Sequence, residues 1–394
     1  MVPHRVVESQ AREFLAGKYG AVDELRPLGG GFWSSAYSFS HAGRALVVRF
    51  GANKDWFEAD RAATAFASPD LPVPEVVEIG DAFGGAYAVS ARHYGTNLED
   101  VRPDQCDVAG PMLASLLGAL YRVPKSPDLP VGWHWRPPRG DLTWRSWLSE
   151  RLVDDPNPEV HDWRAALTAQ SEADRIFRAC EARVRDLVEA CPERRDLVHG
   201  DLLHANVLVA EDASRPSAVF SWKCSVRGDF LFDVAWCTFW SPWYPGIAAA
   251  DPWSHIRQEP SVRDDADAWV DAPMRHHCYE LHIGATHLGW NAWVGRQTHY
   301  RSMHATSTQP DLARQGEDEH QLRVVNNRTR KQLVANRPRR GGGGWLWQDS
   351  SGSGSTTRMT RARFRTRDTW RSSTSAMASW VAPRFNRVGS GPTM

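Results

Sequence analysis

The chain has 394 residues, of which 42% are hydrophobic and 24% charged, so it has the composition of a globular protein with room for two or three domains. No run of about 18 uncharged apolar residues and no secretory signal is visible, so we expect a cytoplasmic protein without a membrane segment. The six cysteines form no C-x-x-C pair, which favours reduced thiols over a disulfide framework or a zinc ribbon.

The net charge of zero hides an uneven distribution of charge along the chain. From Gln321 onward, fifteen Arg and Lys residues are accompanied by only two acids, Asp349 and Asp368, which leaves a surplus of +13. Residues 1–320 therefore carry −13. This pattern indicates an acidic body followed by a basic tail, and the two parts could attract each other.

Residues 1–93 have the patterns expected of a small, strand-rich lobe in which one helix accompanies a sheet. The expected strands, read from alternating and β-branched patterns, cover residues 29–39, 45–50, 76–79 and 87–90. A helix is expected over residues 55–67, capped by Asp55. The sequence Tyr-Gly-Thr at 94–96 marks a hinge, which we place at residues 94–98.

Residues 99–300 have the patterns expected of a mainly helical lobe. A long helix or a helix pair is expected over residues 161–191, further helices over residues 230–240 and 274–294, and a strand pair over residues 206–222. From residue 301 to residue 394 the chain is polar and basic, and it cannot bury enough apolar surface to offset the entropy lost on ordering. We expect this tail to be disordered. Its patternless, Arg-rich composition also fits translation of a gene in the wrong frame.

The strongest functional signal is the stretch HGDLLHAN at residues 199–206, between an apolar pair and a predicted strand. It places the carboxylate of Asp201 five residues before the amide of Asn206. This spacing is typical of a phosphoryl-transfer loop, in which an Asp accepts the proton of the attacking hydroxyl and an Asn oxygen binds Mg²⁺. We expect these roles for the two residues. An Asp in a surface turn and an Asn that starts a strand are the alternatives.

The chain resembles the aminoglycoside phosphotransferases, and most of all members similar to hygromycin B phosphotransferase. The resemblance covers roughly residues 10–297 and rests on the stretches 71–76, 197–208, 228–236 and 239–243. It implies an α+β, protein-kinase-like fold with two lobes: a small antiparallel-sheet N-lobe and a mainly helical C-lobe. It also implies ATP or GTP as the phosphate donor, Mg²⁺ as the cofactor and a small hydroxylated, amine-bearing acceptor.

The resemblance also suggests which residues hold the nucleotide. Arg49 stands where kinases place the lysine that holds the phosphates, and Asp60, or else Glu58, is the helix acid that would pair with it. A charged side chain on an exposed strand is the alternative for Arg49. His199 would orient the catalytic loop through hydrogen bonds rather than take part in the chemistry.

The glycine-rich turn supplies the remaining nucleotide contacts in this interpretation. Gly30 and Gly31, together with Ser34 and Ser35, would cap the phosphates through backbone N–H groups. An ordinary hairpin loop explains the same residues without a ligand.

Ser221 departs from the family pattern, in which an aspartate bridges Mg²⁺ and the nucleotide phosphates. A serine hydroxyl is neutral and offers the metal one weak oxygen, so we expect impaired metal binding and weak transfer. Nearby Lys223 and Arg227 could hold phosphates but not the metal. Three interpretations stay open: a degenerate pseudoenzyme, the product of a lesioned or mispredicted gene, and an enzyme whose metal ligand has shifted to Asp229 or Asp212.

Acidic residues of the second lobe would suit a cationic acceptor such as an aminocyclitol. Asp229, Asp233 and Glu280 are the candidates for substrate contact. Bracing the catalytic loop or capping a helix is the alternative role for the first two, and solvated surface charge is the alternative for all three.

The expected activity is O-phosphorylation of such an acceptor, as in aminoglycoside resistance, by a monomer that binds neither a membrane nor a specific nucleic acid. A catalytically dead, pseudokinase-like binder of nucleotide or ligand is the first alternative. An interaction protein that acts through the basic tail is the second. Phosphate transfer would indicate the enzyme, and nucleotide binding without turnover would indicate the pseudokinase-like binder. Loss of binding on deletion of the tail would indicate the interaction protein.

Overall fold

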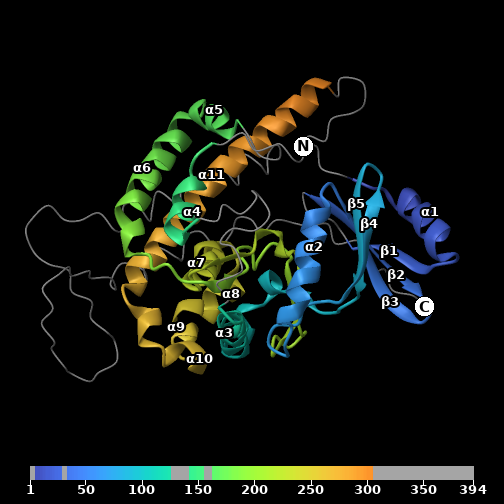
Figure 1. Ribbon diagram of the computed structural model, residues 1–394, viewed down its shortest axis with the longest axis horizontal. Coiled ribbons are helices and arrows are strands. Elements are labelled where there is room, and N and C mark those ends of the chain that lie inside the picture. Colours follow the sequence, from blue (N-terminus) through green and yellow to red (C-terminus); the bar gives the residue numbers. More distant parts are fainter. Residues whose placement is uncertain (1–4, 29–32, 126–141, 155–161, 305–394) are drawn as a thin grey trace, which may run out of the picture. The chain divides into compact units, whose positions relative to one another are not determined.

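The computed structural model describes residues 5–28, 33–125, 142–154 and 162–304, all within one compact unit of the chain, Met1–Ala335. For residues 296–304 only the backbone is described. The described part is an α+β, kinase-like fold with an antiparallel N-terminal sheet and a mainly helical C-terminal lobe (Figure 1). Among the described helices, none combines the length and apolarity needed to cross a membrane. Gly30, Gly31 and nearly all of the predicted basic tail lie outside the described residues.

The N-lobe is a five-stranded antiparallel sheet in the order β1-β2-β3-β5-β4. Its elements are α1 (Glu8–Tyr19), β1 (Asp23–Pro27), β2 (Ser34–His41), β3 (Arg44–Gly51), α2 (Lys54–Ala63), β4 (Val76–Ala82) and β5 (Gly85–Ala91). Along β3, Leu46, Val48 and Phe50 are buried in a core shared with α1, while Arg49 points to the other face. Because successive side chains of a strand point to opposite faces, Arg49 lies on the face of the sheet that packs against α2, where it pairs with Asp60.

Two N-lobe elements differ from the sequence prediction. The helix predicted over residues 55–67 begins at Lys54 and ends at Ala63, and its cap is Asn53, whose side chain accepts the Asp55 N–H at 2.9 Å. The elements α1 and β1 were not predicted. Their sequences carry weak apolar patterns, since only Ala11 and Leu15 of α1 are buried, so they depend on packing against the sheet.

The C-lobe contains nine α-helices among its described residues, and α3, α7 and α11 pass through its core. They are α3 (Cys106–Arg122), α4 (Trp144–Glu150), α5 (Trp163–Thr168), α6 (Ser171–Leu187), α7 (Leu231–Trp240), α8 (Pro245–Ala250), α9 (Pro252–Ile256), α10 (Pro260–Arg263) and α11 (Ala272–His304). Residues 161–191, predicted as one long helix or a helix pair, form the pair α5 and α6. The helix predicted to end at residue 294 continues to His304, because no proline interrupts it.

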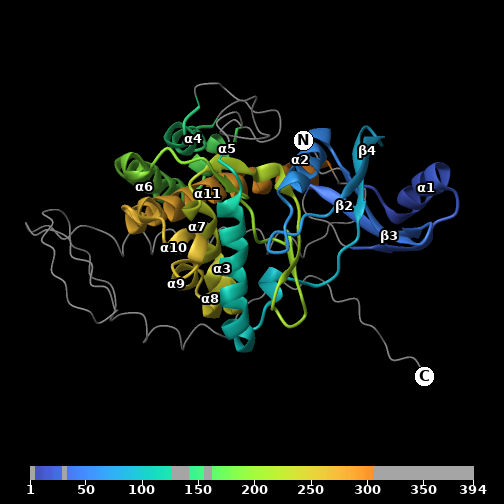
Figure 2. The ribbon, with the colours of Figure 1, turned by 60° about the horizontal axis from the view of Figure 1, so that its bottom comes forward.

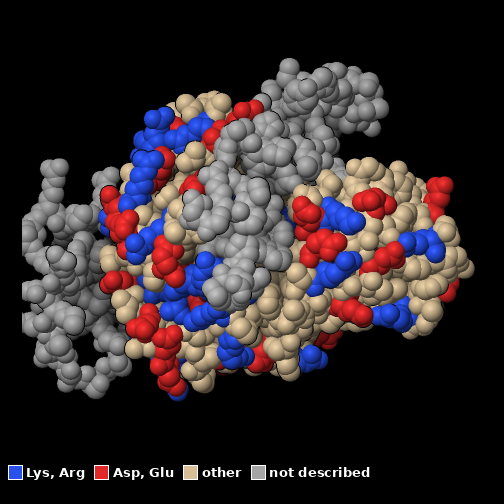
Figure 3. All heavy atoms as spheres, in the orientation of Figure 1, with Lys and Arg blue, Asp and Glu red and all other residues tan. Residues whose placement is uncertain are grey.

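Short strands bring the predicted site residues of the C-lobe together on the side that packs against α2. They are β6 (Thr96–Asn97), β7 (Asp196–Val198), β8 (Val207–Val209), β9 (Pro216–Val219) and β10 (Val226–Gly228), which form the sheets β10-β7 and β6-β8-β9. Figure 2 shows α2 between the N-lobe sheet and this region, and α2 packs directly on the one-turn helix Trp222–Cys224 that follows β9. Acidic and basic side chains are interspersed on the described part of the face in Figure 3.

Candidate active site

The catalytic-loop candidate, residues 199–206, connects β7 to β8. Its first two residues are hydrogen-bonded to the side chain of Asp233 in α7. One carboxylate oxygen of Asp233 accepts the His199 N–H at 2.7 Å, and the other accepts the Gly200 N–H at 2.8 Å. Gly200 has φ +76°, and a Cβ there would lie 2.7 Å from the Cys224 carbonyl oxygen. A glycine is therefore required for the loop to turn against the segment that follows Ser221.

His199 joins the catalytic loop to the strand that precedes Ser221. Its Nδ1 accepts the Asp201 N–H at 3.2 Å, so Nε2 is assigned the proton and donates to the Phe220 carbonyl oxygen at 3.2 Å. Burial lowers the pKa of His199, and the imidazole stays neutral. These contacts are those of a residue that positions the loop.

Asp201 lies at the surface of this loop with 19% of its side chain exposed. Its Oδ1 accepts a hydrogen bond from His204 Nδ1 at 2.8 Å. Burial lowers the pKa of His204, but the bond to Asp201 outweighs it and the net direction is upward. Asn206 donates from Nδ2 to the Asp201 carbonyl oxygen at 2.8 Å, so the amide oxygen is the atom of Asn206 that could bind a metal.

Arg49 of β3 forms an ion pair with Asp60 of α2, and both side chains are largely buried. The second carboxylate oxygen of Asp60 accepts the Trp222 N–H at 2.7 Å. Asp60 therefore connects the strand that carries Arg49 to the residue after Ser221. The sequence suggested the first of these contacts but contained no signal for the second, because 162 positions separate Asp60 from Trp222.

Ser34 and Ser35 lie in β2 and pair with Gly51 and Phe50 of β3. The Ser35 hydroxyl accepts the Val6 N–H at 3.2 Å, so this side chain is engaged with the N-terminal segment. The backbone role proposed for both serines at the nucleotide phosphates stays a prediction.

The side chains of Asp229 and Asp233 are buried and hydrogen-bonded, which favours the alternative bracing role over substrate contact. Asp229 accepts two hydrogen bonds from Arg275, at 2.8 and 2.7 Å, and one from the Tyr279 hydroxyl at 2.6 Å. Burial raises the pKa of Asp233 to about 7, although its two backbone N–H donors oppose the shift. Glu280 is half-buried between α7 and α11, where it accepts a hydrogen bond from Thr238, and its substrate role stays a prediction.

Ser221 occupies a left-handed backbone conformation, with φ 67° and ψ 50°, directly after β9. The pairing of β8 with β9 continues through a hydrogen bond from the Phe220 N–H to the Asn206 carbonyl oxygen at 3.0 Å. Asn206 and Ser221 therefore lie at the same end of this ladder. A left-handed conformation favours Asn and Asp over other non-glycine residues, so this backbone suits the aspartate that the family pattern requires.

Three side chains that the sequence analysis did not select surround the catalytic-loop candidate. Glu99 accepts the Ala205 N–H through Oε1, and the His204 ring lies edge-on to Trp236 and Trp240, with centroids 5.8 and 5.0 Å away. Glu99 Oε2 and the indole nitrogens of both tryptophans are buried without a hydrogen-bond partner in the part of the chain described. One buried acceptor and two buried donors thus lie close to Asp201, and such groups call for a polar ligand or water.

Comparison with known proteins shows which family the chain belongs to. The sequence pattern of the phosphotransferase enzyme family matches residues 24–263, which is more than half of the chain. The chain belongs to this family. A hygromycin-B 4-O-kinase from Escherichia coli is 31% identical over 241 residues, which are 60% of this chain and 67% of the relative.

Solved structures of the phosphotransferase family agree with the fold. A thermostable variant of the aminoglycoside phosphotransferase APH(4)-Ia, bound to AMP-PNP and hygromycin B, has a TM-score of 0.63 and 26% identity, and the match covers 82% of this chain and 97% of that one. A second variant, bound to ADP and hygromycin B, has a TM-score of 0.65 and 25% identity, covering 83% and 99%. These relatives bind a nucleotide and an aminoglycoside together.

The residues of this chain do not fit the Mg²⁺ site that the family implies. Asn206 and Ser221 offer only neutral oxygens, whereas Mg²⁺ prefers anionic ligands in near-octahedral geometry. Asp229, one candidate for a shifted ligand, is paired with Arg275, and Asp212, the other, bonds to Ser214 in an exposed turn. Within the described ranges, no group of three His, Cys, Asp or Glu side chains is placed to hold a metal.

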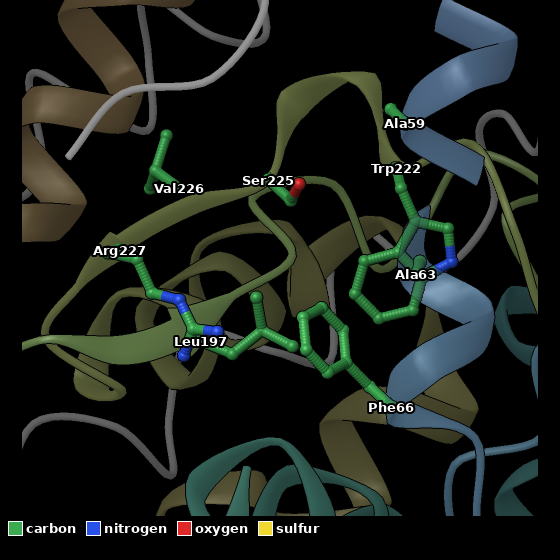
Figure 4. A pocket seen from close by; sticks show the side chains of 8 residues that line it. All are labelled: Ala59, Ala63, Phe66, Leu197, Trp222, Ser225, Val226 and Arg227. Carbon is green, nitrogen blue, oxygen red and sulfur yellow. The ribbon is translucent and has the colours of Figure 1, made fainter. Parts of the chain in front are cut away.

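A small apolar pocket lies beside α2, and none of the residues that line it belongs to the catalytic loop (Figure 4). It is lined by Ala59, Ala63, Phe66, Leu197, Trp222, Ser225, Val226 and Arg227. Arg227 is buried in its wall and donates to the Pro124 carbonyl oxygen at 3.1 Å, so it is unsuited to the phosphate contact suggested by the sequence. Asp201 and Asn206 do not line this pocket. The candidate active site is therefore the catalytic loop and its neighbours, and not the pocket.

Proposed function

We propose that this chain uses ATP or GTP to phosphorylate a hydroxyl group of a small, cationic, amine-bearing molecule such as an aminoglycoside. The observation that carries the proposal is the partly exposed Asp201, held by a loop that Asp233 and His199 brace. In the reaction, the acceptor oxygen attacks the terminal phosphorus, its proton passes to the Asp201 carboxylate, and the nucleoside diphosphate leaves. Arg49, oriented by Asp60, would hold the phosphates.

The groups around Glu99 support a cationic, hydroxylated acceptor. If the side chains that cover these buried atoms move aside on binding, the unpartnered Glu99 Oε2 could accept from an ammonium group, and the indole N–H groups of Trp236 and Trp240 could donate to hydroxyl oxygens. The aromatic faces near His204 suit the apolar faces of a sugar ring. The acceptor hydroxyl would then lie close to Asp201, as the reaction requires.

Replacing Asp201 with asparagine is expected to lower the rate of phosphate transfer about 100-fold or more, because the amide cannot accept the proton. The measurement is nucleotide-dependent phosphorylation of hygromycin B, followed by mass spectrometry, with Asp212→Asn in an exposed turn as the control. Equal rates in Asp201→Asn and the unaltered protein would remove Asp201 from the mechanism. To raise a weak starting rate, the same comparison can be made with Ser221→Asp present in every variant.

Replacing Glu99 with glutamine is expected to raise the KM for an amine-bearing acceptor about tenfold and to leave kcat nearly unchanged, because a charge-assisted hydrogen bond is lost. Glutamine keeps Oε1 for the Ala205 N–H, so the loop should hold its shape. The control is Glu211→Gln on the exposed turn after β8. A fall in kcat without a change in KM would place Glu99 in the support of the loop instead.

A binding protein without turnover is the second candidate, and the neutral Ser221 favours it. In that case the unaltered chain would bind nucleotide but transfer no phosphate, and the Asp201→Asn variant would bind equally well. A role for the basic tail, residues 301–394, stays a prediction because nearly all of it lies outside the described residues.

A further inference from the structure

Arg227 of β10 is a buried cation whose guanidinium group is only partly hydrogen-bonded. The residue is 3% exposed and lies opposite Leu197 of β7 in the strand pair. Its Nη1 donates to the Pro124 carbonyl oxygen at 3.1 Å, and the guanidinium carbon is 5.4 Å from the centroid of the Phe66 ring. Within the described ranges, Nη2 is buried and has no hydrogen-bond partner. A buried donor of this kind calls for a ligand or water.

The charge of Arg227 is also uncompensated, because no carboxylate of the described residues forms an ion pair with it. Asp196 acts on Arg227 through its charge, but its carboxylate already pairs with Arg194 at 2.6 Å and with Lys125 at 3.0 Å. Arg195 adds a further positive charge. Burial lowers the pKa of Arg227, yet a guanidinium keeps its proton at ordinary pH. A buried charge is costly unless a counter-charge lies beside it.

The pocket in Figure 4 offers a place for such a counter-charge. Arg227 forms part of its wall, and none of the described residues that line it is acidic. The Ser225 hydroxyl supplies a second donor, and the other lining side chains are apolar or aromatic. The cavity volume is about 20 Å³, which is room for one particle the size of a water molecule or a little larger. This combination suits a small anion, and it is too small for a nucleotide phosphate chain.

We propose that this pocket binds a small inorganic anion of halide size, held by Arg227 Nη2 and the Ser225 hydroxyl. The proposal goes beyond the proposed function and does not rest on it, because neither nucleotide nor acceptor takes part. Ala59 and Ala63 of α2 line the opposite part of the pocket wall. A bound anion would therefore strengthen the packing of β10 against the helix that carries Asp60.

The test is thermal melting of the full-length protein, without nucleotide, in mixtures of potassium chloride and potassium gluconate at constant ionic strength. Gluconate is too large for the pocket and serves as the inert anion. As chloride replaces gluconate, the Tm is expected to rise by about 2–4 °C and then to level off, because a ligand that binds only the folded chain stabilises it by mass action. Bromide should act as chloride does, and acetate, which is larger, should have little effect.

Three variants show whether the rise in Tm comes from this pocket. Arg227→Met removes the charge with little change in side-chain length and should abolish the chloride dependence. Ala63→Val narrows the pocket while Arg227 stays in place, and it should reduce the rise by at least about half. Arg175→Met, at an exposed arginine of α6, is the matched control and should keep the full rise.

A Tm of the unaltered protein that does not depend on chloride would overturn the anion site, and so would an equal rise in a folded Arg227→Met variant. Should Arg227→Met not fold, Ala63→Val decides, since an undiminished rise in that variant would place the chloride effect elsewhere. The measurements contain no nucleotide and no acceptor, so their failure leaves the phosphotransferase proposal intact.

Discussion

Replacing Ser221 with aspartate is expected to increase Mg²⁺-dependent phosphate transfer at least about tenfold, which corresponds to roughly 1.4 kcal/mol of the activation free energy. The carboxylate would supply the anionic oxygen that Mg²⁺ prefers and would lie at the same end of the β8–β9 ladder as Asn206. The measurement is the initial rate of transfer to hygromycin B as a function of Mg²⁺ concentration, beside the unaltered protein.

Ser221→Asn is the matched control for this experiment. Asparagine tolerates the left-handed conformation at this position as well as aspartate does, but it carries no charge. Both substitutions should raise the Tm slightly by relieving backbone strain, and only aspartate should raise the rate. Equal rate increases in the two variants would show that backbone conformation limits activity. Robust transfer by the unaltered protein, with no gain from aspartate, would contradict our account of the site.

Breaking the pair formed by Asp229 and Arg275 is expected to lower the free energy of unfolding by about 3–5 kcal/mol, because each single substitution leaves an unpaired charge or donor in the core. Both side chains have 0% exposure, and the Tyr279 hydroxyl completes the network by donating to Asp229. The measurement is urea unfolding of Asp229→Asn and of Arg275→Met.

Two controls accompany the unfolding experiment. Asp264→Asn, which breaks the exposed pair of Arg263 and Asp264, should leave the unfolding midpoint unchanged. The double substitution of Asp229 and Arg275 by apolar residues should lose less stability than either single change, since no uncompensated charge remains. A single variant with the midpoint of the unaltered protein would show that the network does not hold α11 against the strand-to-helix segment.

Local patterns in the sequence were enough to predict the central strands and the catalytic loop. The alternation in β3 places Arg49 opposite its buried neighbours, because successive side chains of a strand point to opposite faces. The five-residue spacing from Asp201 to Asn206 lies within one loop and therefore needs no tertiary information. The α+β fold with two lobes follows from the same short-range signals and from the family resemblance.

Burial and long-range contacts could not be predicted in this way. In the sequence, Asp229 and Asp233 are candidates for substrate contact because they are acidic residues of the second lobe. In the folded chain each is hydrogen-bonded to a distant segment: Asp229 to Arg275, and Asp233 to the catalytic loop. Glu99 reaches Ala205 across 106 positions, a distance at which no periodic pattern links two residues. The extents of α1 and α11 also depend on packing, since their own apolar patterns are weak.

The identity of the chemical groups is thus a property of the sequence alone: a carboxylate at 201, an amide at 206, and a hydroxyl at 221 where the family pattern requires a second carboxylate. Their arrangement is a property of the folded chain. Strand pairing sets Ser221 at the same end of the β8–β9 ladder as Asn206, and burial favours a structural role for Asp229 and Asp233, because the free energy of a charge depends on the partners and solvent around it.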